Sequence, residues 1–288
     1  MQFLYKTPGY LLLLFGGFCL SWGGFIIRSF EEASVWQILL LRSIFFMLAL
    51  IVFLLLTYKK NTIKIIKDAG FPALLGGLVM SLSFIAFVVS MSNTSVANVV
   101  FIISTQTMFL AIFGYFYLKE KVSVISFISI VLAMSGIVVM VGDSLSSGFF
   151  FGNIVALAIP INFSILVMII RKNKNLDMVP AIFYSGIFSI IYGLILSESF
   201  VFTSHDILMG FFLGVPQLAF GFICITIGSR STPSTTIGLL MLTETIFGPI
   251  WVWLFLNEIP PLSVFIGGLV IIIAIIIKSF DKNNPVQT

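Results

Sequence analysis

The chain consists of long apolar runs separated by short connections rich in Gly, Pro, Asn, Ser and charged residues. A run of about 20 apolar residues is long enough to cross a bilayer as a helix. Such runs occur at residues 9–27, 35–57, 70–91, 96–118, 123–142, 149–170, 178–197, 206–228, 235–256 and 261–279. The pattern therefore predicts an all-α integral membrane protein with ten transmembrane helices.

Two of these runs are similar in sequence and align without a gap, from Thr94 to Glu120 and from Thr232 to Glu258. Matches continue outside them, at Leu75-Gly76 with Leu213-Gly214, Phe84-Ile85 with Phe222-Ile223, Gly9 with Gly152, and Arg28 with Arg171. Because each copy holds an odd number of helices, the second copy must be inverted relative to the first. The sequence therefore predicts two inverted five-helix repeats, residues 8–142 and 148–280. Such repeats typically hold a substrate near the bilayer midplane.

The composition supports a membrane protein, with 59% hydrophobic and 9% charged residues. The net charge of +4 comes from Lys and Arg in short loops, and it does not indicate nucleic-acid binding. If the N-terminus is cytoplasmic, most of these basic residues lie in cytoplasmic loops, as the positive-inside rule requires. We therefore expect a multi-pass protein of the inner membrane with both termini in the cytoplasm.

The sequence offers few groups for metal binding or catalysis. It has one histidine, His205, and its two cysteines both lie in apolar runs, so we expect no metal, no cofactor and no disulfide framework. An intramembrane enzyme acting on lipid would need a base with a nucleophile, or two close carboxylates. A channel usually builds its pore from rings of like groups. Neither pattern is present, and transport is the favoured class.

Glu244 lies near the middle of an apolar run, and Gln106 occupies the matching position of the first copy. An ionisable group at that depth costs roughly 2.5–3.5 kcal/mol on insertion scales, which indicates a functional role. Three roles are open for Glu244: proton carrier, ligand for a cationic substrate, or ion-pair partner of Arg42. Arg42 has two further alternatives, which are capture of a substrate carboxylate and snorkelling to the outer face.

Thr243, Phe247 and Trp251 share a helix face with Glu244, and Asn98, Thr105 and Phe109 share one with Gln106. Asn162 and Gln217 lie beside prolines in other runs, and Trp22 offers an aromatic face to a cation. The expected substrate site comprises Glu244, Gln106, Trp22, Asn98, Thr105, Thr243, Phe109, Phe247, Trp251, Asn162 and Gln217. Polar groups backed by aromatic rings suit a molecule with one charged end and one apolar end. For the threonines and Asn98, hydrogen bonding between helices is an equal alternative.

The fourth helix of each copy ends in an acid, at Leu118-Lys119-Glu120 and Leu256-Asn257-Glu258, and Ser21-Trp22-Gly23 lies in the first helix. In this order and repetition, with Arg42 in the second helix, these motifs resemble the EamA family of the drug/metabolite transporter superfamily, over about residues 8 to 280. The resemblance implies a secondary transporter of small organic molecules that works by alternating access. It implies export or exchange, with export favoured. Because the sequence has no ATP-binding motif, we expect a proton or substrate gradient to supply the energy.

The expected partners are a small metabolite (amino acid-like or an amphipathic cation), protons and the lipid bilayer, with no nucleic acid and a monomer or homodimer as the assembly. Import or exchange of a cationic metabolite such as S-adenosylmethionine is the alternative, and an intramembrane lipid-modifying enzyme is the alternative from another class. The family often has a proline in its fourth helix where this chain has Thr107 and Thr245. We therefore expect the helix kink to be absent there, or moved to Pro249. Glu120 and Glu258 are expected to make cap or loop contacts.

Overall fold

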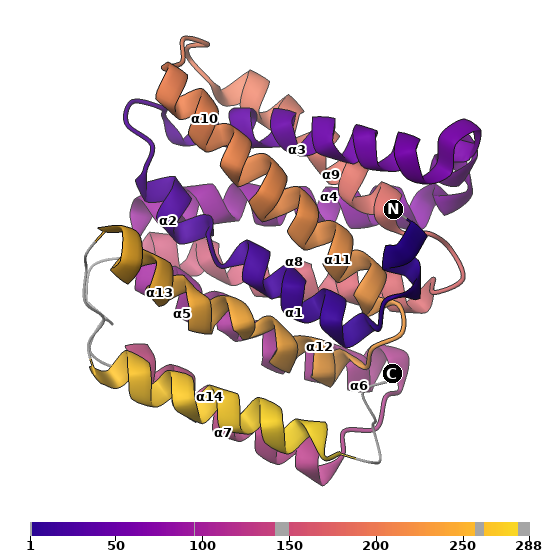
Figure 1. The fold of residues 1–288 in the computed structure, drawn as a ribbon, viewed down its shortest axis with the longest axis vertical. Helices are drawn as coiled ribbons and strands as arrows, with labels where there is room; N and C mark the ends of the chain where they lie inside the picture. The colour runs from indigo at the N-terminus through magenta and orange to yellow at the C-terminus, as the bar shows by residue number, and fades with distance from the viewer. Residues whose placement is uncertain (1, 95, 142–149, 257–261, 282–288) are drawn as a thin grey trace.

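The computed structural model describes residues 2–94, 96–141, 150–256 and 262–281, and these residues form helices and connections with no strand (Figure 1). In chain order the helices are η1 (Gln2–Lys6), α1 (Gly9–Leu20), α2 (Gly23–Arg28), α3 (Val35–Tyr58), η2 (Lys59–Asn61), α4 (Thr62–Asn93), α5 (Val96–Ser104), α6 (Gln106–Leu118), α7 (Val124–Val141), α8 (Phe150–Lys172), α9 (Val179–Leu196), α10 (Ser204–Phe212), η3 (Leu213–Ala219), α11 (Phe220–Ser229), α12 (Ser234–Met241), α13 (Thr243–Leu256) and α14 (Leu262–Ser279).

Seven helical stretches of the described chain are long and apolar enough to cross a bilayer. One of them, Val35–Asn93, has 59 residues and is interrupted where Lys59 and Gly70 adopt positive φ angles of 51° and 54°. The apolar helices Val124–Val139 and Phe265–Ser279 are shorter. The all-helical, apolar architecture is that of an integral membrane protein, as the sequence predicted.

Several of the long helices are broken near their middle. The α5–α6 helix is interrupted at Thr105 and the α12–α13 helix at Leu242, and neither position is a proline. The expectation that this kink would be absent or moved to Pro249 was wrong, because both helices are broken and Pro249 lies inside α13. At the breaks, the hydroxyl groups of Thr105 and Thr243 donate to the carbonyls of Ile102 and Leu240, 2.6 Å away in each case. Such bonds compete with the helical ladder, but Ser81 and Ser185 make the same kind of bond inside α4 and α9 without a break there. The hydroxyl bonds therefore accompany the two breaks and do not by themselves account for them.

The helices pack in pairs that join the two ends of the sequence (Figure 1). Helix α4 packs on α8 and α9, while η3 and α11 pack on α3 and α1. Helix α6 packs on α12, and α7 pairs with α14 at one edge of the bundle (Figure 1). Segment η1 and the last turn of α14 lie at the same end of the bundle, which also carries the α3–α4, α6–α7, α8–α9 and α11–α12 connections (Figure 1). We call it the basic end because these connections and the helix ends beside them contain most of the Lys and Arg residues.

One buried cation at the basic end has a structural explanation. The ammonium group of Lys278 donates to Ser126 Oγ at 2.6 Å and to Asp281 Oδ2 at 2.8 Å. Burial alone would raise the pKa of Asp281, but hydrogen bonds from Lys278, Ser123 and Ser126 lower it below its usual range. This satisfied cluster joins α14 to the start of α7 and lies apart from the centre of the bundle.

Close packing of η3 on α3 depends on Gly214. A Cβ atom at Gly214 would lie 2.5 Å from the carbonyl oxygen of Arg42 and 2.7 Å from the Cβ of Phe45. We expect Gly214→Ala to force the two helices apart and to lower the free energy of unfolding by about 1–3 kcal/mol. The matched control is Gly268→Ala, since a Cβ atom there meets nothing within 4 Å. Thermal unfolding in detergent measures both variants, and equal melting temperatures would contradict the packing argument.

Candidate central cavity

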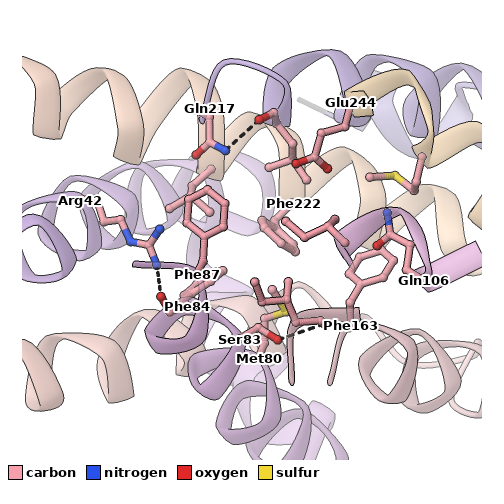
Figure 2. A pocket seen from close by; sticks show the side chains of 15 residues that line it. Arg42, Met80, Ser83, Phe84, Phe87, Gln106, Phe163, Gln217, Phe222 and Glu244 are labelled. Atoms are coloured by element: carbon pink, nitrogen blue, oxygen red, sulfur yellow. Dashed lines mark hydrogen bonds between the residues drawn. The ribbon is translucent and has the colours of Figure 1, made fainter. Parts of the chain in front are cut away.

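A cavity of about 50 Å³ lies at the centre of the bundle, where α1, α3, α4, α5, α6, α8, η3, α11, α12 and α13 contribute side chains (Figure 2). Its wall is formed by Leu20, Arg42, Met80, Ser83, Phe84, Phe87, Ile103, Gln106, Ile159, Phe163, Gln217, Leu218, Phe222, Met241 and Glu244. This volume holds a few water molecules, whereas sites for drug-sized molecules have about 300–1,000 Å³. The cavity in this structure is therefore smaller than a site for a drug-sized molecule.

Glu244 lies in the first turn of α13, directly after the break in that helix, and its carboxylate lines the cavity (Figure 2). The positive end of the helix dipole favours a carboxylate in this turn. Within the described chain, the carboxylate forms no hydrogen bond and no ion pair. It is thus a partly buried acceptor available to a ligand or a proton.

Arg42 lies at another side of the same cavity and is only 1% exposed (Figure 2). Its Nη2 donates to the Phe84 carbonyl at 2.7 Å, and its guanidinium lies 5.2 Å from the Phe84 ring centroid and 5.6 Å from that of Phe87. Its Nε has no hydrogen-bond partner. The described residues contain no ion pair between Arg42 and Glu244, because the Phe84 carbonyl and the two rings hold the guanidinium away from the carboxylate. The structural-pair alternative for these two residues therefore fails in this state.

Two amides complete the polar lining. Gln106 is the first residue of α6, directly after the break at Thr105, and it is 3% exposed. Gln217 lies in the π-helical turn η3 next to Pro216, and its Nε2 donates to the Leu20 carbonyl at 3.2 Å. The Oε1 atom of Gln217 is buried without a partner. The cavity thus offers a carboxylate, a guanidinium and two amides to a ligand.

The aromatic residues expected in the site lie outside the cavity lining. Trp22 stacks on Trp251 with ring centroids 3.9 Å apart, and Phe18 packs edge-on against Phe247 at 5.3 Å. Trp251 Nε1 donates to Ser21 Oγ at 2.7 Å. These side chains form an aromatic cluster between α1–α2 and α13.

The remaining predicted residues also make contacts within the protein. Asn98 is fully buried and donates to Thr94 Oγ1 at 3.0 Å, while Phe109 packs against Phe113 at 6.0 Å. Thr105 and Thr243 bond the carbonyls at the helix breaks, and Asn162 is half-buried outside the cavity lining. Of the predicted residues, the cavity brings together Glu244, Gln106, Gln217 and Arg42.

Sequence reasoning missed the apolar part of the wall, namely Leu20, Met80, Phe84, Phe87, Phe163 and Phe222 among others. In a chain with 32 phenylalanines, no single Phe is distinctive. The available signal was the repeat, because Phe84 and Phe222 occupy matching positions and pack on each other at 5.5 Å.

Comparison with known protein families identifies the family of this chain. A model of the EamA-like transporter family matches residues 7–142 and 150–280. The chain belongs to the EamA-like transporter family. This confirms the resemblance found in the sequence motifs.

An uncharacterized transporter of Clostridium kluyveri is 27% identical to this EamA-like chain over 267 residues, which cover 85% of each protein. The crystal structure of a protein that is 14% identical in sequence is similar to this fold, with a TM-score of 0.79. The match covers 93% of this chain and 96% of the other protein's chain. At that identity the likeness shows the fold alone. Family and relative together point to a transporter rather than an enzyme.

The basic end of this EamA-like transporter is held together by two polar clusters. Glu120 forms an ion pair with Arg171 at the end of α8 and accepts a 2.9 Å hydrogen bond from the backbone N–H of Ser234, the first residue of α12. Glu120 thus makes the cap contact expected of it and joins α6, α8 and α12. Glu258, expected to make a similar contact, lies outside the described residues.

The second cluster joins the N-terminal segment to the helices. The hydroxyl groups of Tyr5 and Tyr58 bond each other and Asp177, and Asp177 also accepts from the Val179 N–H at 3.0 Å. Burial and the neighbouring Asp177 carboxylate raise the pKa of Tyr5 above its usual range, so this phenol stays protonated and can donate at physiological pH.

Proposed function

We propose that this protein is a secondary transporter that moves a small organic metabolite across the inner membrane by alternating access. It has ten transmembrane helices in two inverted repeats, residues 8–142 and 148–280, with both termini in the cytoplasm. The substrate is amino acid-like or an amphipathic cation, the direction is export, and proton coupling or exchange supplies the energy. The observation that carries the proposal is an unpaired carboxylate, Glu244, in a central cavity between the repeats.

The cavity wall supports the two-repeat architecture. Five pairs of matching positions have both members in the wall: Leu20 and Phe163, Met80 and Leu218, Phe84 and Phe222, Ile103 and Met241, and Gln106 and Glu244. An axis relating the two halves would pass between the members of each pair, and therefore through the cavity. A site on such an axis can open to either side of the membrane when one half rocks against the other.

Helix contacts away from the cavity support the same symmetry. Helix α4 of the first half packs on α8 and α9 of the second, and the matching segment, η3 and α11, packs on α1 and α3 of the first. At the start of the first helix of each half, a Cβ atom on Gly9 would lie 2.6 Å from Thr232 Oγ1, and one on Gly152 would lie 2.9 Å from the Cβ of Thr94. Gly9 matches Gly152, and Thr94 matches Thr232.

The lining chemistry favours a substrate with a cationic group and an apolar body. The Glu244 carboxylate attracts an ammonium or sulfonium group, and the Gln106 and Gln217 amides provide neutral hydrogen bonds. Arg42 retains donors beyond the one used on the Phe84 carbonyl, which suits a substrate carboxylate on the opposite side. Phe84, Phe163 and Phe222 provide the apolar surface. A zwitterion with an apolar side chain fits these groups together.

We expect ligands with a cationic group to raise the melting temperature of the purified protein, because binding stabilises the folded state by mass action. The experiment screens amino acids, nucleosides and organic cations by thermal shift, and then follows counterflow of each hit in proteoliposomes. A substrate must both stabilise the protein and exchange across the membrane. Imposed pH gradients of each sign then test proton coupling and direction.

Protein-free liposomes and liposomes containing the Glu244→Gln variant are the controls. Saturable counterflow of a hit in wild-type liposomes alone would support the transporter and its site. Chemical conversion of a hit without counterflow would support the enzyme alternative instead. Uptake that exceeds export under every gradient would favour the importer of a cationic metabolite.

A further inference from the structure

An open polar pocket of about 650 Å³ lies at the basic end, separate from the central cavity. Three cations line it: Arg171, Lys174 and Arg230. Glu120, the one acid in its wall, is already paired with Arg171. Arg230 is oriented by two hydrogen bonds to the Lys174 carbonyl, at 3.2 and 2.9 Å. The exposed ammonium of Lys174 makes no hydrogen bond or ion pair with the described residues, so the pocket has a positive charge available to an anion.

A second hollow, of about 660 Å³, has an almost purely apolar wall. It lies between α1, α3 and the α10–η3–α11 helix, and its wall includes Phe3, Phe45, Val52, Phe211 and Ile223. Several of these side chains are exposed, among them Phe3 at 66% and Val52 at 52%. An apolar groove on the outside of membrane helices faces hydrocarbon chains.

The pocket and the groove adjoin each other along two segments. In η1, Phe3 and Leu4 line the groove, and Tyr5 lines the pocket. On α11, Ile223 lines the groove and Ile227, one turn further on, lines the pocket. Residues four apart lie on the same face of a helix, so one face of α11 runs from the apolar groove into the basic pocket.

We propose that the pocket and the groove together form a binding site for an anionic phospholipid. The phosphate of the headgroup lies near Lys174 and Arg230, and one acyl chain lies along α3 and α11 in the groove. Basic pockets between membrane helices on the cytoplasmic side suit anionic headgroups. The proposal rests on the orientation given under Proposed function, because the basic end must meet the cytoplasmic leaflet.

One helical segment, η3, lines both the groove and the central cavity. Val215 of η3 lines the groove, and Gln217, two residues further on in the same π-helical turn, lines the cavity. Arg171 of the basic pocket holds Glu120 and, through it, the start of α12. A lipid in this site therefore contacts elements that must move when the cavity widens.

The test measures lipid binding to the detergent-purified full chain by thermal shift and native mass spectrometry. The probes are phosphatidylglycerol and phosphatidylcholine with identical acyl chains, and glycerol phosphate as the soluble headgroup. We expect phosphatidylglycerol to stabilise the protein most. Lys174→Gln should weaken its apparent affinity about five-fold, since one basic residue near a membrane surface contributes about that factor. Ala49→Phe, which fills the groove, should remove the stabilisation by both lipids.

The matched controls are Lys60→Gln, an exposed lysine of η2 outside the pocket, and Ala111→Phe on α6 outside the groove; both should behave like wild type. Equal stabilisation by the two lipids, or equal losses in Lys60→Gln and Lys174→Gln, would overturn the proposal. Full stabilisation by glycerol phosphate alone would also overturn it, in favour of a soluble anion. Because the readout needs no transport, failure of the proposed function and failure of the lipid site are distinguishable.

Discussion

Glu244→Gln will remove recognition of a cationic substrate and leave the fold intact. An amide is tolerated at this depth, because Gln106 occupies the matching position and lines the same cavity. The substitution also removes a buried charge that has no partner among the described residues, so the melting temperature of the unliganded protein should stay the same or rise. A hydrogen bond to a charged group contributes about 1.5–3 kcal/mol, and its loss should weaken cation binding by roughly 10- to 150-fold.

The measurement is a ligand titration of wild type and Glu244→Gln, with Glu244→Asp as a variant that retains the charge on a shorter side chain. We expect the aspartate variant to bind with intermediate affinity. Binding by the wild type should weaken as the pH falls, because protonation removes the carboxylate charge, and binding by the glutamine variant should not depend on pH in this way. If cations stabilise wild type and Glu244→Gln equally, the carboxylate does not bind substrate. If Glu244→Gln then still binds cations but its transport no longer responds to a pH gradient, the carboxylate transfers protons.

Much of the helical fold followed from hydropathy, because in a bilayer every backbone polar group must be satisfied within a helix. The ends of α3, α8, α9 and α14 lie within a few residues of the predicted spans. The breaks at Thr105 and Leu242 did not follow. Proline is the usual mark of such a break, whereas these two breaks coincide with threonine hydroxyl groups that bond backbone carbonyls. Whether a threonine does so is decided by the surrounding packing, which hydropathy does not encode.

For the candidate site, the sequence identified the charged and amide residues but not their surroundings. Glu244, Gln106, Gln217 and Arg42 were conspicuous because polar groups are costly in an apolar run. Phe247 and Trp251 were grouped with Glu244 by helical periodicity, which fixes the face of one helix but not the helix it meets. Trp22 was added as an aromatic face for a cation. In the structure, that face of α13 meets α1 and α2, and the rings pack on each other.

The ion pair between Arg42 and Glu244, one of the three roles left open for Glu244, is not formed among the described residues, for a related reason. Opposite charges in apolar runs suggest an ion pair, since each is costly alone. The sequence does not reveal that the Phe84 carbonyl and the rings of Phe84 and Phe87 hold the guanidinium. Because both charges line the cavity without meeting, a zwitterionic ligand can bridge them. The hypothesis of a zwitterionic substrate therefore depends on the separation of Arg42 from Glu244, which no pattern in the sequence predicts.

Substitutions of Glu120 will open the basic end of the protein. Its carboxylate joins α8 through Arg171 and α12 through the Ser234 N–H, and α12 leads to the break beside Glu244. Glu120→Gln removes the ion pair but retains an oxygen that can accept from the Ser234 N–H. The closed basic end should therefore lose up to about 1 kcal/mol relative to the open one, which raises the open population about five-fold. Glu120→Ala also removes the helix cap, worth about 1 kcal/mol, and the rise should reach roughly 25-fold.

The readout is labelling of Ile227→Cys by an impermeant maleimide, in a Cys19→Ser, Cys224→Ser background and in inside-out vesicles. Ile227 lines the basic pocket and is only 7% exposed, so its labelling rate reports opening. Glu198→Gln is the matched control, because this exposed acid lies at the opposite end of the bundle and loses the same charge. The order Ala above Gln above wild type is expected, with the control equal to wild type. Equal rates in all four proteins would mean that Glu120 is only a helix cap, and that opening at this end depends on Tyr5, Tyr58 and Asp177 instead.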